Sequence, residues 1–383
     1  MGLGASALRA LGKGVADAVD REAAELTASL VLALAPDSAL LGRQRTAAGV
    51  ALVGEVLVAA RSAPPSRSVA RSLAALRLVL GDDHPRSADL DAALASLRVP
   101  TAWLPGAPLR LHRLVCSTEV LGDVRATYAL VDSDDLPLRV LGVQTDLNLD
   151  HASALLYGTR EALDAVEAMT AEEPTADWRE VVDPEERAQV VAETRHALRE
   201  LREQPVAWRC LDGSERGQQA LLERRWAELA DLVGEPTQRR APPAAEKRAQ
   251  LRAKFLSSYE HGDFPADAPA VVDLLLDVDE RWDCGWGRVS ARKLSLLPER
   301  VCELRHWHAE DLPAGFFAVL TSWTGWCARR AGLPVEDQLR VLATVEALEL
   351  QWDEPDGLLE LVWGGDVMAG ATLPPARLVR LAG

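Results

Sequence analysis

Over the first hundred residues, apolar side chains recur every three or four positions, which is the spacing of one face of an α-helix. The first stripe covers residues 26–34, follows Asp20, which can cap a helix, and stops at Pro36. Further stripes lie within residues 38–62, 66–80 and 90–97, and each ends near a Pro or Gly. The pattern predicts a bundle of short helices over residues 1–100.

The period changes to two after Pro108. Apolar and polar residues alternate over residues 109–116, 124–130 and 138–142, as they do in strands with one buried face. Turn-forming residues separate these segments, which predicts a three-stranded antiparallel meander. Helical patterns return at 153–171, after Asp183, and at 215–233, so residues 101–236 are predicted to form an α+β domain.

The rest of the chain is helical in pattern. Residues 237–245 are polar and proline-rich, which predicts a linker before a C-terminal domain over residues 246–383. Two apolar segments split by Gly364-Gly365-Asp366 predict a terminal hairpin. The fold class expected is α+β and mainly α, with a helical N-terminal part, a central meander with helices and a Trp-rich helical C-terminal domain. Helices are predicted there at residues 246–259, 268–282, 291–301, 313–331 and 335–350.

Tryptophan gathers in that last domain, in a chain with only three Tyr and four Phe. Within the predicted helix at 313–331, Trp323 falls in a continuous apolar arc and Trp326 at its margin, which favours a buried core. The functional alternative is a partner-binding groove walled by Trp286, Trp307 or Trp326. The opposite side of this helix carries small residues, including Gly325, and predicts a neighbouring backbone close by.

Charge and cysteine usage narrow the class of protein. The net charge is −16, and the acidic excess lies in residues 101–383, the opposite of a phosphate-binding surface, so no nucleic-acid partner is expected. The five cysteines form no CxxC pair, which is typical of reduced thiols in the cytoplasm. The longest apolar run contains Glu55 and is too short to span a bilayer, so no membrane partner is expected either.

Two clusters contain some of the residues that a metal site needs. Residues 146–151 begin like a calcium loop, with oxygen ligands at alternate positions, but His151 stands where the loop needs Gly and Tyr157 where it needs a carboxylate. Cys302, His306 and His308 lie close in sequence, but no second cluster completes a zinc site. The sequence also lacks a P-loop, a GxSxG motif and a dinucleotide fingerprint. We therefore expect neither a metal nor a cofactor.

Several short pieces of the chain carry a resemblance: Arg288-Val289-Ser290, Leu296-Leu297-Pro298-Glu299-Arg300-Val301, the run from Leu312-Pro313 to Trp323, and Gly332-Leu333-Pro334. The stretch from Phe255 to Leu350 resembles the C-terminal region of a group of uncharacterised actinobacterial proteins. The middle region, with Leu121-Gly122-Asp123 and Val143-Gln144-Thr145-Asp146, is similar to their central part. Some members carry a SEC-C zinc motif, which this chain lacks, so the resemblance implies neither zinc nor catalytic residues.

Two functions compete at this stage. The first is a non-enzymatic role in protein binding or scaffolding in the bacterial cytoplasm, with another protein as partner. The alternative is a metal-dependent hydrolase that uses Asp146, Asp150 and His151. Whether these three side chains converge in a concave pocket distinguishes the two. The sequence leaves the oligomeric state open.

Overall fold

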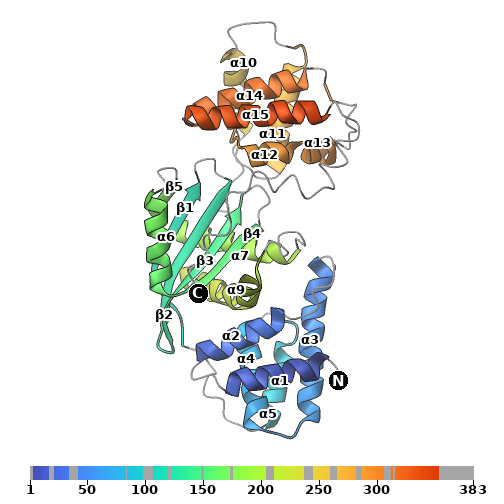
Figure 1. Cartoon of the computed structure of the whole chain (residues 1–383), viewed down its shortest axis with the longest axis vertical. Helices are drawn as coiled ribbons and strands as arrows, with labels where there is room; N and C mark the ends of the chain where they lie inside the picture. The colour runs from blue at the N-terminus through green and yellow to red at the C-terminus, as the bar shows by residue number, and fades with distance from the viewer. Residues whose placement is uncertain are drawn as a thin grey trace.

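The N-terminal region is a bundle of helices, as predicted (Figure 1). In this computed structural model, the helices are α1 (Leu3–Ala16), α2 (Arg21–Ala33), α3 (Gly42–Ser62), α4 (Arg67–Leu80) and α5 (Ser87–Leu97). The sequence pattern did not predict α1. The structure describes residues 3–16, 21–33, 42–82, 84–97, 107–119, 123–147, 151–172, 176–203, 211–236, 245–258, 265–281, 287–305, 312–313 and 315–352.

Local chemistry sets the ends and the packing of these helices. Ser66 caps α4 by accepting a hydrogen bond from the amide of Val69 at 3.2 Å. Gly4 lies where α1 meets α3, and a Cβ atom there would fall 2.4 Å from the backbone of Glu55. Only glycine permits this approach, so it fixes how closely the two helices pack. Their shared core includes the fully buried Leu11 and Leu73.

A five-stranded antiparallel sheet forms the centre of the molecule, with strand order β4-β3-β2-β1-β5. The predicted meander corresponds to β1 (Arg110–Glu119), β2 (Val124–Ser133) and β3 (Leu136–Asp146). Strands β4 (His151–Gly158) and β5 (Ala176–Glu180) were not predicted. The helix expected from residue 153 was wrong at its start: α6 covers Arg160–Glu172, because the preceding apolar run pairs with β3 as a strand.

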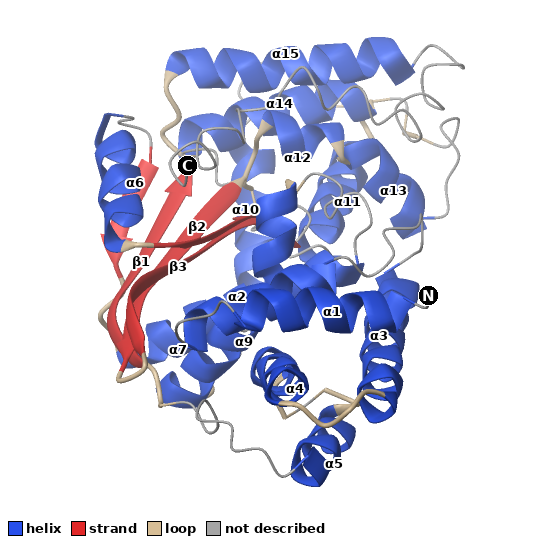
Figure 2. Ribbon diagram, turned by 60° about the horizontal axis from the view of Figure 1, so that its bottom comes forward, coloured by secondary structure: helices blue, strands red, loops and turns tan. Residues whose placement is uncertain are grey.

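Helices cover both faces of this sheet (Figure 2). Alternate residues of one strand serve opposite faces: Val140 packs towards α6, whereas Leu141 packs towards α7 (Pro184–Glu203) and α9 (Gly213–Val233). Helix α9 begins with a capping box formed by Asp212 and Glu215. The same helix contacts the edge of the sheet, since Glu215 and Gln218 accept hydrogen bonds from the amides of Leu155 and Tyr157 in β4, at 3.1 and 2.9 Å.

The C-terminal region contains only helices among its described residues. Phe255 and Trp323 lie in its core, with ring centroids 5.0 Å apart in an edge-to-face arrangement. The predicted linker at 237–245 lies outside the described residues except for Ala245, and the predicted terminal hairpin lies wholly outside them. The helices are α10 (Ala245–Ser258), α11 (Ala268–Arg281), α12 (Ala291–Ser295), α13 (Leu297–Arg305), α14 (Phe316–Arg330) and α15 (Val335–Trp352).

The small-residue side of α14 differs from the expectation. Gly325 and Ala328 are buried, but Ala318 on the same side is exposed. The atoms nearest to a Cβ at Gly325 would belong to the side chains of Arg329 and Leu342, at 3.3 and 3.7 Å. Among the described residues, side chains and not a neighbouring backbone lie beside Gly325, so they do not provide the predicted backbone approach.

None of the helices in the described ranges has both the length and the apolar character needed to cross a bilayer.

Candidate functional site

Two of the three residues proposed for a metal-dependent hydrolase lie opposite each other in the sheet. Asp146 ends β3, His151 begins β4, and the two are register partners with side chains almost fully buried. Asp150 lies outside the described residues. The carboxylate of Asp146 forms an ion pair with Arg292 of α12, and Nδ1 of His151 lies 3.0 Å from the carbonyl oxygen of Ala152. The carboxylate that would face a metal is thus already held by a guanidinium group.

The described part of the chain brings no three His, Cys, Asp or Glu side chains together in a way that could hold a metal ion. The side chains of Cys302, His306 and His308 lie outside that part. The thiols of Cys116 and Cys327 are free and buried, and burial raises the pKa of both, that of Cys327 to about 12. These two thiols therefore stay protonated at neutral pH and are poor nucleophiles.

A polar junction joins the sheet to the C-terminal helices. Ser290, the N-cap of α12, accepts a hydrogen bond from the amide of Lys293 at 3.0 Å and donates one to Asp123 at the start of β2. Arg288 also pairs with Asp123, at 3.3 Å. With the Asp146–Arg292 pair, these contacts connect α12 and the segment before it to both β2 and β3. We call these five residues (Asp123, Asp146, Arg288, Ser290 and Arg292) the sheet junction.

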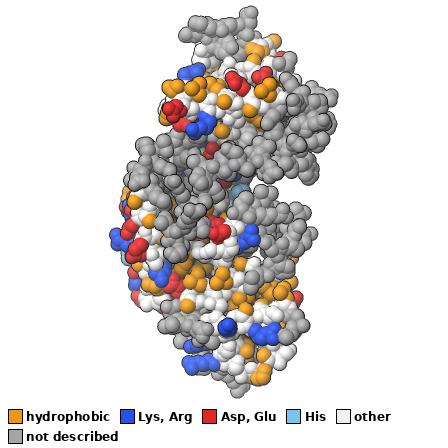
Figure 3. All heavy atoms as spheres, viewed as in Figure 1, with side chains coloured by type: hydrophobic (Ala, Val, Ile, Leu, Met, Phe, Trp, Pro, Cys, Tyr) orange, Lys and Arg blue, Asp and Glu red, His pale blue; other side chains and the backbone are white. Residues whose placement is uncertain are grey.

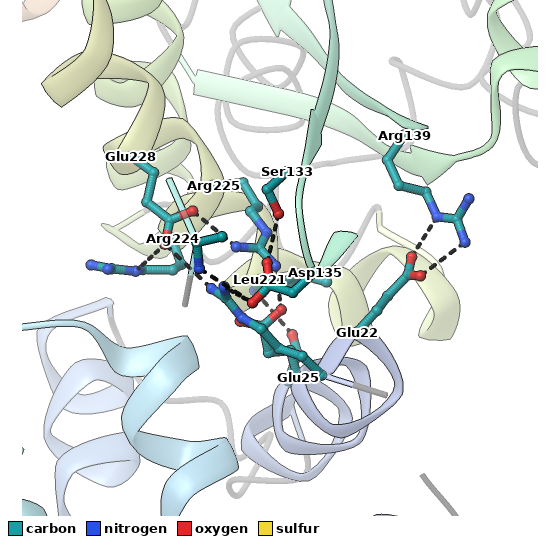
Figure 4. A network of polar contacts seen from close by, with 12 residues as sticks. Glu22, Glu25, Ser133, Asp135, Arg139, Leu221, Arg224, Arg225 and Glu228 are labelled. Carbon is teal, nitrogen blue, oxygen red and sulfur yellow. Dashed lines mark hydrogen bonds and ion pairs between the residues drawn. The ribbon is translucent and has the colours of Figure 1, made fainter. Parts of the chain in front are cut away.

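A second and larger set of charges lies between α2, the sheet and α9 (Figure 4). Arg225 of α9 pairs with Glu25 of α2, and both side chains are completely buried. Arg225 also contacts Glu228 at 2.9 Å, and Arg21 contacts Glu25 at 2.9 Å. We call the whole set the charge network; its members are Arg21, Glu22, Glu25, Asp135, Arg139, Tyr157, Arg224, Arg225 and Glu228.

The outer contacts of the charge network reach the strands. Arg21 pairs with Asp135, in the turn after β2, at 2.9 Å. Glu22 accepts hydrogen bonds from Arg139 of β3 at 2.8 Å and from the hydroxyl of Tyr157 in β4 at 2.9 Å. Helix α2 is therefore tied to three segments of the sheet region through one turn of its own.

Burial and charge act in opposite directions inside this network. Desolvation raises the pKa of Glu25, although Arg225 and Arg21 act to lower it. Desolvation also acts against the charge of Arg225, but attraction to Glu25 and Glu228 outweighs it and raises the pKa of this guanidinium group. Burial, aided by Glu22, raises the pKa of Tyr157, so its hydroxyl keeps the proton that it donates. The central pair of the network, Arg225 and Glu25, is closed to solvent.

Of the three tryptophans proposed to wall a groove, the structure describes one. Trp286 and Trp307 lie outside the described residues. Trp326 is half-buried on α14, with its ring centroid 5.6 Å from those of both Phe255 and Trp323. The guanidinium carbon of Arg330 lies 5.4 Å from its ring centroid. Trp326 thus lies at the margin of the core, covered in part by a cation.

A shallow cavity of about 670 Å³ lies between α1, α3 and α5. Small and apolar residues line most of it, together with Glu55, Arg61, Arg86 and Asp89. Glu55 accepts a hydrogen bond from the amide of Gly4 at 2.9 Å, and Arg86 pairs with Asp89 at 2.9 Å. Three of its four charged groups therefore already have partners within the bundle.

Helix α15 carries an exposed apolar surface. Val341, Val345 and Leu348 on one side of this helix are buried in the C-terminal core. On the other side, large apolar residues are open to solvent, which we call the outer face: Val335 is 69% exposed, Leu339 62% and Leu350 72%, with the exposed Ala343 between them. Figure 3 shows hydrophobic side chains on the surface of the C-terminal region, together with acidic and basic ones.

Sequence reasoning placed the helix at 335–350 but missed the outer face. The signal was present in the spacing, because positions 335, 339, 343 and 350 fall within one arc of a helical wheel. A second arc holds residues 341, 345 and 348. The prediction gave only the bounds of this helix and did not assign either of its two apolar sides.

Comparisons of the chain with models of protein families, with curated proteins and with solved structures found no match.

Proposed function

We propose that this chain is a non-enzymatic protein-binding or scaffolding protein of the bacterial cytoplasm, and that the outer face of α15 carries its binding surface. The observation that carries the proposal is the pair of apolar sides on α15, one buried in the core and one exposed. Single exposed apolar residues are ordinary, but several large ones along one helix mark an interaction surface. The partner is another protein.

The energetics support a binding role and limit its strength. Full burial of a Val or Leu side chain is worth about 1.5–3 kcal/mol, so covering the exposed parts of three such residues would contribute about 3–6 kcal/mol. A millimolar complex already corresponds to about 4 kcal/mol, and association itself costs free energy. Because association itself takes up most of this gain, the apolar residues of the outer face are not sufficient alone, and a stable complex requires polar contacts and apolar surface from the partner as well.

The two sets of buried ion pairs support the scaffolding part of the proposal. The charge network connects the N-terminal helices to the sheet, and the sheet junction connects the sheet to the C-terminal helices. Charge pairs of this kind require specific geometry, because a buried charge that loses its partner is costly. The charge network and the sheet junction therefore favour one arrangement of the N-terminal helices, the sheet and the C-terminal helices. The resemblance to uncharacterised actinobacterial proteins and the absence of a nucleic-acid partner remain predictions.

The proposal is tested by affinity capture from an extract of the source organism, with the full chain as bait. Leu339→Glu places a charge on the outer face, and Val182→Glu is the matched control, since Val182 is 66% exposed in the central region. We expect the wild-type chain and the control to capture the same protein and Leu339→Glu to lose it, with unchanged circular dichroism in all three. Equal capture by both variants would show that α15 is not the surface.

A further inference from the structure

We infer that the partner presents a basic amphipathic helix, which lies along the outer face of α15. This inference rests on the proposed function and specifies the chemistry of the partner. Three features carry it: the length of the apolar stripe, the acidic residues along it, and the small number of arginines near it.

The stripe has the dimensions of a helix-docking surface. From Val335 to Leu350 the outer face extends for about 22 Å along α15, at about 1.5 Å per residue. This length matches about four turns of a partner helix. Such a helix would place apolar side chains at intervals of three and four residues against Val335, Leu339, Ala343 and Leu350.

Glutamates accompany the stripe along its length. On a helical wheel, Glu336 and Glu349 lie on opposite borders of the apolar arc, and Glu346 lies within it. All three are exposed, and none forms an ion pair with any residue in the described ranges. A partner that covers the stripe must therefore bring its own groups towards three carboxylates.

The arginines near the stripe neutralise only part of this charge. Arg340 is paired with Asp337 of its own helix at 2.9 Å. The guanidinium group of Arg329 on α14 lies beside Gly325, 3.3 Å from where a Cβ atom of that residue would be. Three glutamates against Arg329 alone leave the outer face acidic, so lysine or arginine residues flanking the apolar side of a partner helix complement it. Charges at such a rim mainly select the partner and speed its association.

The test uses the full-length chain and two labelled synthetic peptides of about 18 residues, with binding measured by fluorescence anisotropy. Both peptides carry leucine at helical spacing; one has lysine at the flanking positions and the other has glutamate. We expect the lysine peptide to bind at least about tenfold more tightly, and its affinity to fall as salt rises.

Two pairs of variants locate the effect. Leu339→Glu should weaken binding of the lysine peptide at least about tenfold, whereas Val182→Glu should change it less than about twofold. The double variant Glu346→Lys/Glu349→Lys should reverse the preference between the peptides. Its control, Glu161→Lys/Asp164→Lys on the exposed surface of α6, changes the net charge of the chain equally and should leave the preference intact.

Three other outcomes would overturn the inference of a basic partner helix, and each can be told apart from a failure of the proposed function. Equal binding of the two peptides, with dependence on Leu339, would retain a protein-binding face and reject a basic partner. A dimer in light scattering that Leu339→Glu converts to a monomer would assign the face to a second copy. Tighter peptide binding by Arg377→Glu/Arg380→Glu would assign it to the C-terminal segment of this chain. The proposed function itself would fail if Leu339→Glu captured the same host protein as the wild-type chain.

Discussion

The charge network and the outer face of α15 invert the usual distribution of residues. Arg225 and Glu25 are charged and fully buried, whereas Leu339 and Leu350 are apolar and more than half exposed. In most proteins, charged residues are almost never buried without a partner, and large contiguous apolar patches are rarely exposed. The two regions show that residues in an unusual environment can have two different roles. A buried pair orients parts of one molecule, and an exposed apolar stripe is available to another molecule.

The largest expected effect comes from removing one member of the buried pair. Arg225→Met leaves Glu25 and Glu228 without their shared partner in the interior, and should lower the free energy of unfolding by about 3–5 kcal/mol. Urea denaturation followed by circular dichroism measures it. Arg224→Met is the matched control, because Arg224 is the next residue and contacts the same Glu228, but is 27% exposed. It should cost about 1 kcal/mol or less. Equal losses would mean that burial does not distinguish the two pairs.

A smaller effect is the dependence of stability on pH that Glu25 produces. The folded protein holds a proton on Glu25 more tightly than the unfolded chain, because burial raises its pKa above the ordinary 4.5. As pH rises from about 4.5 through the raised pKa, the unfolded state loses the proton first, so the contribution of Glu25 to stability falls.

This contribution is isolated by comparison with Glu25→Gln, which cannot titrate. The stability of the wild-type chain relative to this variant should decrease as pH rises above about 4.5. Asp82 and Asp135, whose pKa values are lowered mainly by contacts with Arg77 and with Ser133 and Arg21, titrate below the ordinary 3.8 and are common to both proteins. A difference that grows with pH would show that Arg225 and Arg21 outweigh the desolvation of Glu25.

The smallest change in the free energy of unfolding is expected for a substitution on the outer face of α15. Leu339→Ala should change the free energy of unfolding by no more than about 0.5 kcal/mol, since its side chain contributes little to the core. Leu348→Ala on the buried side of the same helix should cost about 2–5 kcal/mol. Urea midpoints of the two variants make the comparison. A large loss for Leu339→Ala would mean that the outer face stabilises the fold and is not held available for a partner.

The parts of the fold that follow from local periodicity were predictable. Helical spacing placed α14 and α15, and alternation placed β1, β2 and β3. Strand β4 was missed because its sequence, HASALLYG, is apolar on both sides and has no clear period of two. Its residues are buried on one face by α6 and on the other by α7 and α9, which a local pattern does not reveal.

The candidate sites were harder to predict, because they depend on contacts between distant segments. Glu25 and Arg225 are 200 positions apart, and nothing near either residue indicates the other. The sequence singled out Asp146 as a possible metal ligand, but its carboxylate forms an ion pair with Arg292 of α12. The outer face of α15 was visible in the spacing of residues 335–350, but which of two apolar sides is buried depends on where α12 and α14 lie.

The hydrogen bonds that the edge of β4 donates to α9 limit how this protein can aggregate. Glu215 and Gln218 occupy two outward-facing amides of β4, so another strand cannot pair with that edge unless α9 moves away. Growth of an extended fibre by strand addition requires two open edges on each molecule. With β4 blocked, the opposite edge at β5 could join at most two sheets into a closed pair. Folded molecules that meet through their sheets would therefore stop at two and not continue into a filament.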